Sequence, residues 1–397
     1  MKSKSIRLLK KISNEMQKFL SNNNNLCVNC TRKNDIIDAI LYKLYYTEAS
    51  STQEKATIKL NKFKNVINKS SRQSLVKKEK KLDVSFYEKL SNFLSCQINK
   101  NTDTCGNYTR QIIAVDGTFP TLLNTIAKDG YKLNKNKNSV TPLVSGLFNI
   151  TSNYPVILDL VKNKNERSAF INFVKNKDKF KNNIFVFDRG YVSDNLFNFM
   201  DHSDLFFICR LRDNNKYIST KDDNIVISDN NVKMRIITYK IKGKPYYMAT
   251  NVFDYSTNII KNIYHDRWKV EEYFKYIKQH MKLAKMNEKR EKDIIKTIIS
   301  QLIVSQMTFL FVNLFKKHDN DSKIVNKSVL TVGIYDKFLY NFFNNHKFTK
   351  YFLLNFINEY IQYVNSKKGR SFKHQCKRPN YRWYFKKYFT NVKSKNT

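Results

Sequence analysis

Cysteine is scarce in this chain of 397 residues, with only six copies, at positions 27, 30, 96, 105, 209 and 376. This is not the density of a disulfide-stapled scaffold, and it fits a reducing compartment. Cys27 and Cys30 have the spacing of half a zinc site. No second Cys or His pair with ligand spacing lies near them, so we interpret them as two thiols in a loop.

An apolar leader is absent as well. The first residues, MKSKSIRLLKK, lack the apolar run of a signal peptide, so secretion is not expected. Glycine (8 residues) and proline (5 residues) are also few. Together with abundant Asn, Lys and Ile, this reflects the codon usage of an AT-rich genome and indicates nothing about chemistry.

Acidic residues are outnumbered by basic ones, 33 against 72, which gives a formal net charge of +39. This charge far exceeds what solubility requires and indicates a polyanionic partner. Nucleic acid is the first candidate, and an anionic membrane surface is the competing one. The sequence therefore favours a nucleic-acid-binding protein.

The longest apolar segment, Thr297–Phe315, approaches the length of a membrane span. Polar residues interrupt it, namely Ser300, Gln301, Ser305, Gln306 and Asn313. Such interruptions favour a buried core helix over a span, so no membrane partner is expected.

The order of predicted elements indicates a mixed α/β core. Apolar residues at helical spacing predict helices in Asp35–Tyr46 and Leu82–Phe93, within a basic region 1–105 that is either a DNA-binding domain or a solvated bundle. Strands are then predicted at Gln111–Asp116, Leu143–Phe148, Tyr154–Asp159, Asn183–Asp188 and Leu205–Arg210, with helices at Arg167–Lys175 and from Ser193. Three strands, helix, strand, helix, strand is the order of a ribonuclease-H-like sheet.

The remaining regions follow from the same patterns. We expect the core in two parts, 106–211 and 257–318, separated by a β-strand insertion at 212–256. One long helical region is predicted from Asn258 to beyond Lys292. Residues 319–397 form a basic helical C-terminal region. Its aromatic segment Arg378–Phe389 either contacts nucleic acid or packs on the core.

Two aspartates end predicted strands. Asp116 is followed by Gly117 and Thr118, and Asp188 by Arg189, Gly190 and Tyr191. Carboxylates at the carboxyl ends of parallel strands converge at one edge of an open sheet, where sites form. The alternative is that each aspartate only caps a turn or a helix, which Asp often does.

A polar stripe on a later helix carries a third carboxylate. At about 100° per residue, the side chains of Tyr264, Arg267, Glu271 and Lys278 fall within an arc of roughly 60°, whereas Glu272 points away. The neighbouring arc is apolar and consists of Val270, Phe274, Ile277 and Met281. A half-buried carboxylate beside a phenol, an Arg and a Lys suits phosphodiester chemistry. Ordinary surface ion pairs on an amphipathic helix are the alternative.

The spacing Tyr-x2-Arg-x3-Glu-x6-Lys resembles the signature of the insertion sequence 4 family of DDE transposases. That family also carries an Asp after its first core strand, an Asp-Arg-Gly-Tyr-like turn after its fourth, and a β insertion before the Glu helix. The segments 116–118 and 188–191 match the two Asp motifs. The resemblance covers about residues 106–300, and the insertion between 212 and 251 is shorter than the longest in the family.

The resemblance implies that Asp116, Asp188 and Glu271 are catalytic and bind two divalent ions, Mg²⁺ or Mn²⁺, which suit oxygen ligands. It further implies that DNA phosphates are contacted by Tyr264, Arg267, Lys278 and, in a supporting role, Arg189. Double-stranded DNA, as transposon ends and target, is the expected partner of an intracellular, DNA-associated homodimer.

The expected function is therefore that of a DNA transposase that cuts and joins transposon ends by metal-dependent phosphodiester transfer. A ribonuclease-H-like DNA nuclease shares the acidic triad, and specificity for transposon ends would separate the two. A domesticated, non-catalytic DNA-binding relative is the third possibility, although all three acidic positions and the basic stripe are intact.

Overall fold

The computed structural model describes residues 2–23, 33–101, 108–175, 177–219, 221–241, 243–284, 286–316, 323–344 and 348–365. The Cys27–Cys30 pair and the aromatic segment Arg378–Phe389 lie outside the described residues, so the interpretations given for them remain predictions. The chain divides into two compact units, one of Met1–Lys316 with Val325–Gln362 and one of Lys317–Ile324 with Tyr363–Thr397. In the second, the described residues belong to two short paired strands, β11 (Lys323–Val325) and β12 (Tyr363–Asn365). All that follows concerns the first unit.

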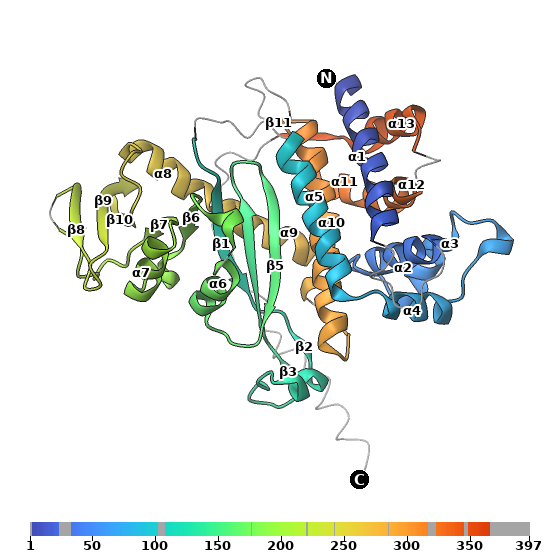
Figure 1. The fold of residues 1–397 in the computed structure, drawn as a ribbon, viewed down its shortest axis with the longest axis horizontal. Helices are drawn as coiled ribbons and strands as arrows, with labels where there is room; N and C mark the ends of the chain where they lie inside the picture. Colours follow the sequence, from blue (N-terminus) through green and yellow to red (C-terminus); the bar gives the residue numbers. More distant parts are fainter. Residues whose placement is uncertain are drawn as a thin grey trace, which may run out of the picture. The chain divides into compact units, whose positions relative to one another are not determined.

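A mixed sheet of eight strands runs from β5 (Tyr154–Val161), in the middle of Figure 1, to β8 (Asp223–Ile227) at its left-hand end. In sheet order the strands are β5, β4 (Leu143–Asn149), β1 (Ile112–Thr118), β6 (Ile184–Phe187), β7 (Phe206–Arg210), β10 (Lys244–Thr250), β9 (Lys233–Ile241) and β8. Strand β4 runs antiparallel to β1 and β5, whereas β6 is parallel to both β1 and β7. This is the strand order of a ribonuclease-H-like sheet, and it confirms the predicted fold.

The strands of the insertion extend the same sheet. Strand β10 pairs antiparallel with β7, from Met248 opposite Arg210 to Thr250 opposite Ile208, and β9 and β8 follow outward. The backbone groups of β7 that would otherwise form an open edge are thereby hydrogen-bonded. The predicted β insertion is thus a continuation of the core sheet.

Each face of the sheet is covered by helices. Alternate residues of β1 enter different clusters: Ile112 and Ala114 pack with the N-terminal and late helices, whereas Ile113 and Val115 pack with α6 (Glu166–Val174) and α7 (Asp194–His202). This follows from the two-residue period of a strand. The first face carries α9 (Trp268–His280), which packs on β1 and β4.

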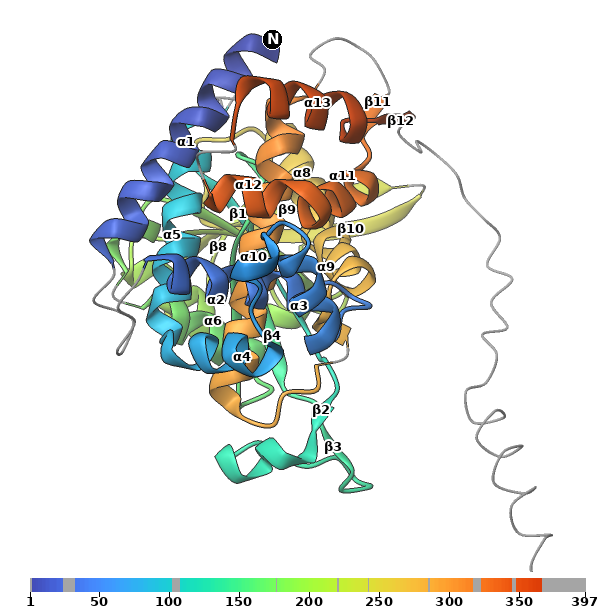
Figure 2. The ribbon, with the colours of Figure 1, turned by 90° about the vertical axis from the view of Figure 1, so that its right-hand side faces the viewer.

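Helix α10 (Glu291–Leu314) lies at the centre of the helical part (Figure 2). It packs against β5 and against the N-terminal helices α2 (Lys33–Tyr46) and α5 (Val84–Asn101). It is long and apolar enough to span a membrane, but 94% of its most apolar window is buried within the protein. Its burial confirms the predicted core helix.

The other helices surround this centre. They are α1 (Lys2–Asn22), α3 (Gln53–Asn61), α4 (Arg72–Lys81), α8 (Thr257–Asp266), α11 (Lys327–Gly333), α12 (Leu339–Phe343) and α13 (Lys350–Tyr360). Side-chain oxygens of Thr52, Ser71 and Thr349 accept backbone N–H groups at the first turns of α3, α4 and α13, which is the favoured way to begin a helix.

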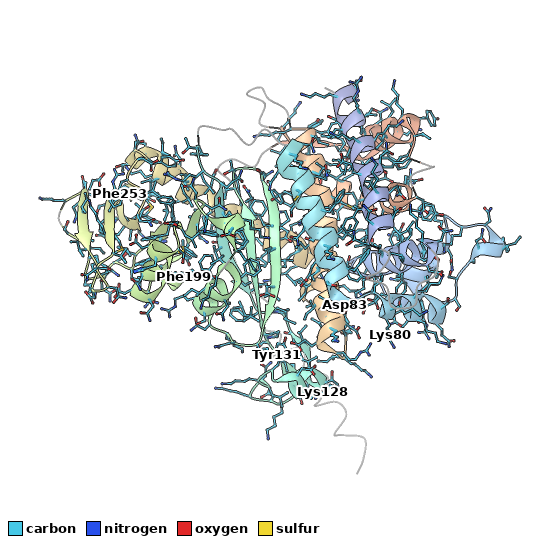
Figure 3. All side chains as sticks on the ribbon, viewed as in Figure 1. Lys80, Asp83, Lys128, Tyr131, Phe199 and Phe253 are labelled. Carbon is cyan, nitrogen blue, oxygen red and sulfur yellow. The ribbon has the colours of Figure 1, made fainter. Side chains whose placement is uncertain are left out.

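A small extension between β1 and β4 carries β2 (Leu122–Leu123) paired with β3 (Ser139–Val140). Lys128 and Tyr131 lie on it (Figure 3). The buried Tyr131 hydroxyl donates to Glu291 Oε1 at 2.8 Å, which fastens the extension to the start of α10.

The long helical region predicted from Asn258 consists of three helices, α8, α9 and α10. The chain passes from α8 to α9 at Arg267, where the Arg267 N–H bonds to the Tyr264 carbonyl three residues back. After α9, Met281 is extended and pairs with Glu48, and the Lys282 N–H donates to the Thr47 carbonyl at 3.0 Å. Backbone pairing with the end of α2 therefore interrupts the helix, an interaction that local periodicity cannot reveal.

Candidate active site

Asp116 and Asp188 lie side by side at the carboxyl edge of the sheet. Ala114 is opposite Val186 in the parallel pairing of β1 with β6, and each aspartate comes two residues later. Asp188 retains an extended backbone (φ −76°, ψ 167°), so the alternation of the strand continues through it. Both carboxylates are therefore expected to face the side of the sheet that α9 covers.

A glycine on β4 sets the position of α9. Gly146 is directly opposite Asp116, and a Cβ at this glycine would lie 2.7 Å from Phe274 Cζ. The ring of Phe274 thus packs against bare backbone beside Asp116. Glu271 comes three residues earlier on the same helix face, which brings the third predicted carboxylate to the same edge.

Arg267 holds Glu271. Arg267 Nη2 donates to Glu271 Oε1 at 2.6 Å, and the two side chains are 9% and 26% exposed. Arg267 Nε is buried and has no hydrogen-bond partner among the described residues. The guanidinium carbon lies 5.7 Å from the centre of the Tyr264 ring. A buried, partly unsatisfied guanidinium is suited to a further anionic ligand.

Electrostatic interactions connect these groups. Burial raises the pKa of Asp116 to about 6, and the carboxylates of Glu271 and Glu166 add to the rise. The Arg267 guanidinium opposes it, as does the backbone N–H of Gly117. Asp116 thus interacts electrostatically with Arg267, Glu271 and Glu166.

The other predicted residues differ in their placement. Tyr264 is buried, and burial raises its pKa to about 12, with Arg267 opposing the rise and Asp188 adding to it. Lys278 is exposed; partial burial lowers its pKa, while Asp116 raises it. Arg189 is exposed, directly after Asp188. Tyr264, Arg267 and Lys278 thus each interact with one of the acidic residues.

Glu166, which begins α6, was missed by the sequence analysis. Burial raises its pKa, and the nearby Asp188 raises it further. The expected helix begins at Arg167, one residue after Glu166. The signal that could have found it is its position as the first carboxylate after β5, a strand parallel to β1 that ends at the same edge.

The carboxylates are close but not in ligand geometry. Among the described residues, no group of three or more Asp, Glu, His or Cys side chains is arranged to hold a metal ion. Glu271 is instead occupied by Arg267. Metal binding through Oε1 of Glu271 would require this oxygen to exchange its partner.

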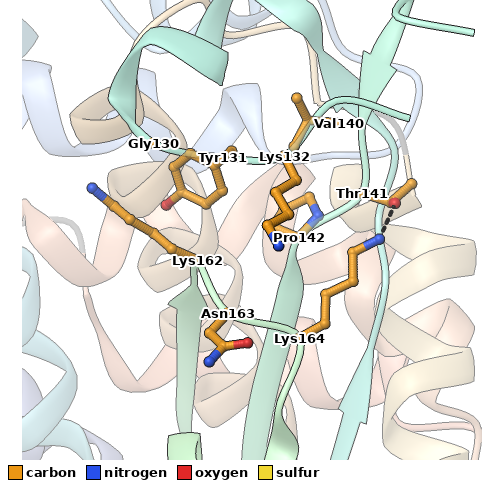
Figure 4. Close-up of a pocket in the computed structure, with 9 residues that line it drawn as sticks. All are labelled: Gly130, Tyr131, Lys132, Val140, Thr141, Pro142, Lys162, Asn163 and Lys164. Carbon is orange, nitrogen blue, oxygen red and sulfur yellow. Dashed lines mark hydrogen bonds between the residues drawn. The ribbon is translucent and has the colours of Figure 1, made fainter. Parts of the chain in front are cut away.

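A basic pocket of about 400 Å³ opens where β5 ends and β4 begins (Figure 4). Three of its lining residues are Lys132, Lys162 and Lys164. Lys164 Nζ donates to Thr141 Oγ1 at 3.0 Å, and Lys162 Nζ lies 3.3 Å from Glu291 Oε1. This cluster is not visible in the sequence, because Lys132 comes from a different loop than Lys162 and Lys164.

Comparison with known proteins identifies the family. The model of the transposase DDE domain matches residues 107–307. The chain belongs to this family. The matched segment of this DDE-domain protein includes every predicted site residue, from Asp116 to Lys278.

The individual relatives of this DDE-domain protein described below have low sequence identity to it. A protein of Synechocystis sp. named as the transposase for insertion sequence element IS4SA is 25% identical over 124 residues, which is 29% of this chain and 37% of that protein. The match thus spans little more than a third of that relative. With the family match, it confirms the resemblance to insertion sequence 4 transposases.

A cryo-EM structure of a piggyBac transposase synaptic complex with hairpin DNA is also similar. The TM-score is 0.43 and the identity 11%, over 93% of this chain and 84% of that chain.

Proposed function

We propose that this protein is a DNA transposase that cuts transposon ends and joins them to target DNA, with Asp116, Asp188 and Glu271 as its catalytic carboxylates. The observation that carries the proposal is that three separate segments, β1, the turn after β6 and α9, bring these carboxylates to one edge of the sheet. The buried Arg267 lies beside them.

The donor atoms fit hard divalent cations. All three side chains offer oxygen only, as Mg²⁺ and Mn²⁺ prefer. Buried polar atoms without partners, Arg267 Nε and the Tyr191 hydroxyl, border the acidic residues, as expected beside a polar ligand. When two ions are bound, they activate the attacking oxygen and stabilise the leaving one.

The remaining roles concern the DNA. The attacking oxygen, from water or a 3′ hydroxyl, forms a bond to phosphorus and loses its proton, while the bond to the leaving 3′ oxygen breaks and that oxygen is protonated. Arg267 Nε and Lys278 hold the non-bridging phosphate oxygens, the Tyr264 hydroxyl orients the strand, and Arg189 assists from the exposed turn.

The partners of the proposed transposase follow from its charge. The net charge of +39 suits double-stranded DNA. We assign the basic pocket, with Lys132, Lys162 and Lys164, to DNA phosphates beyond the scissile one. Two transposon ends must be paired, so a homodimer on DNA inside the cell is part of the proposal.

The deciding experiment uses the purified full-length protein and a plasmid that carries the DNA flanking its own gene. With Mg²⁺ or Mn²⁺, we expect cuts at the element boundaries that disappear in Glu271→Gln. Metal-dependent cuts elsewhere would favour a ribonuclease-H-like nuclease. Specific binding without cuts would favour a non-catalytic relative.

A further inference from the structure

Glu166 lies against the backbone of the residue that follows Asp116. A Cβ at Gly117 would stand 2.9 Å from Glu166 Oε1 and 3.4 Å from its Cδ. The carboxyl group of Glu166 and the Leu143 side chain, whose Cδ1 would stand 2.6 Å from the same Cβ, therefore occupy the space that any side chain at position 117 would take. The absence of a side chain at Gly117 is what admits a carboxylate beside Asp116.

The surroundings of Glu166 are acidic. Asp188 is its main charged neighbour, and Glu166 in turn acts on Asp116. The buried Tyr191 hydroxyl is near enough to interact with Glu166, although it lacks hydrogen-bond geometry to any described residue. Among the described residues, Glu166 forms no ion pair. A half-buried carboxylate surrounded by carboxylates is unfavourable unless a cation joins them.

A purely structural role explains Glu166 poorly. An acidic residue in the first turn of a helix can cap it or favour its dipole. The cap of α6 is already supplied by Asn165, whose Oδ1 accepts the N–H groups of Arg167 and Ser168 at 3.1 and 3.2 Å. Glu166 is thus not needed to cap α6, and it lies near Asp116 and Asp188.

We propose that Glu166 is a fourth metal-binding carboxylate of the acidic site, added to Asp116 and Asp188 from the start of α6. This inference rests on the proposed function, because it takes the acidic site to be a metal site. It gives the site an oxygen donor that does not depend on releasing Glu271 from Arg267. Divalent ions of the Mg²⁺ and Mn²⁺ class are the expected ligands.

The test is a titration of the full-length, DNA-free protein with Mn²⁺ into the millimolar range. Electron paramagnetic resonance measures the bound Mn²⁺ at each step. Glu166→Gln should weaken Mn²⁺ binding by about ten-fold or more, and Glu166→Asp should restore part of it. Asp116→Asn should also weaken binding. The matched control Glu272→Gln, an exposed glutamate on α9, should bind as the unmodified protein does.

Thermal unfolding without metal separates a metal-binding role from a structural one. If Glu166 serves the metal, Glu166→Gln removes repulsion from Asp188 and raises the Tm of the metal-free protein. If Glu166 merely stabilises α6, the same variant lowers the Tm. A lowered Tm together with normal Mn²⁺ affinity would overturn the proposal.

A pair of glycine variants tests the geometry without touching a carboxylate. An added Cβ at Gly117 would stand 2.6 Å from Leu143 Cδ1 and 2.9 Å from Glu166 Oε1, so Gly117→Ala forces both side chains to move and should weaken Mn²⁺ binding. Gly190→Ala, where an added Cβ meets nothing within 4 Å, should leave binding unchanged. Equal binding in both variants would contradict the placement of Glu166.

The Mn²⁺ titrations distinguish a failure of this inference from a failure of the proposed function. Mn²⁺ binding that is lost in Asp116→Asn but kept in Glu166→Gln removes Glu166 from the site and leaves the proposed transposase intact. If the unmodified protein shows no Mn²⁺ binding that depends on Asp116, the metal site itself is wrong. The proposed function then fails together with this inference.

Discussion

Arg267 Nη2 and Glu271 Oε1 are joined at 2.6 Å, one helical turn apart. In a helix, an acidic residue four positions before a basic one is more stabilising than the reverse order found here. Stabilisation of α9 therefore does not explain this contact. The contact neutralises a carboxylate that the proposed function assigns to metal. Under the proposed function, Arg267 and the metal therefore compete for Oε1 of Glu271.

Replacing Arg267 by Gln should strengthen Mn²⁺ binding several-fold, because Glu271 becomes free and a positive charge leaves the site. The same variant should bind transposon-end DNA more weakly, since a phosphate contact is lost. Paramagnetic resonance and gel-shift titration measure the two effects. Arg290→Gln is the control, because Arg290 also pairs with a helical acid, Asp293, but is far more exposed. Weaker Mn²⁺ binding in Arg267→Gln would refute the competition.

Asp116→Asn, Asp188→Asn and Glu271→Gln should each reduce cleavage of end DNA by about a thousand-fold or more, because each removes a carboxylate that the proposed function makes catalytic. DNA affinity should change little, since the basic surface supplies it. Single-turnover cleavage and gel shifts at equal protein concentration give the two values. Retained cleavage in any one variant would remove that residue from the site.

Asp116→Asn should stabilise the metal-free protein at neutral pH. The pKa of Asp116 is raised to about 6 in the folded chain, above its ordinary value of 3.8, so its charged form disfavours folding. The gain should be on the order of 1–3 kcal/mol above pH 6, shrink between pH 6 and 4, and vanish below, where the acid is protonated in both states. Chemical denaturation across this pH range measures it. A gain that persisted at pH 3 would have another cause.

DNA binding should weaken steeply with salt, because each neutralised phosphate releases counterions. Replacing Lys132 and Lys164 together by Gln removes two positive charges. If both lysines contact phosphate, the plot of log affinity against log salt should become less steep by about two. Fluorescence anisotropy between low and moderate salt gives the slope. An unchanged slope would exclude these two lysines of the pocket from the DNA path.

The sequence predicted the sheet and its two aspartates because both depend on local patterns. Apolar strands that end in Asp are visible in the sequence alone. Arg267 and Glu271 keep their helical spacing of four residues, although α8 ends and α9 begins at Arg267. Glu166 was not predicted because its proximity to Asp116 depends on the missing side chain of Gly117, in a different segment. The break after α9 was missed for a similar reason, since Met281 pairs with Glu48, far away in the chain.

Helix α10 has a consequence for how the chain is made. Ser91 on α5 bonds to Gln306 on α10, and Lys43 on α2 bonds to the carbonyl of Asp293. The earliest helices to leave the ribosome thus have partners that are synthesised much later. A message cut short before residue 291 would yield a chain that carries Asp116, Asp188 and Glu271 but lacks the helix that packs against both β5 and α5. A fragment that contains all three acidic residues but ends before α10 is therefore not expected to fold.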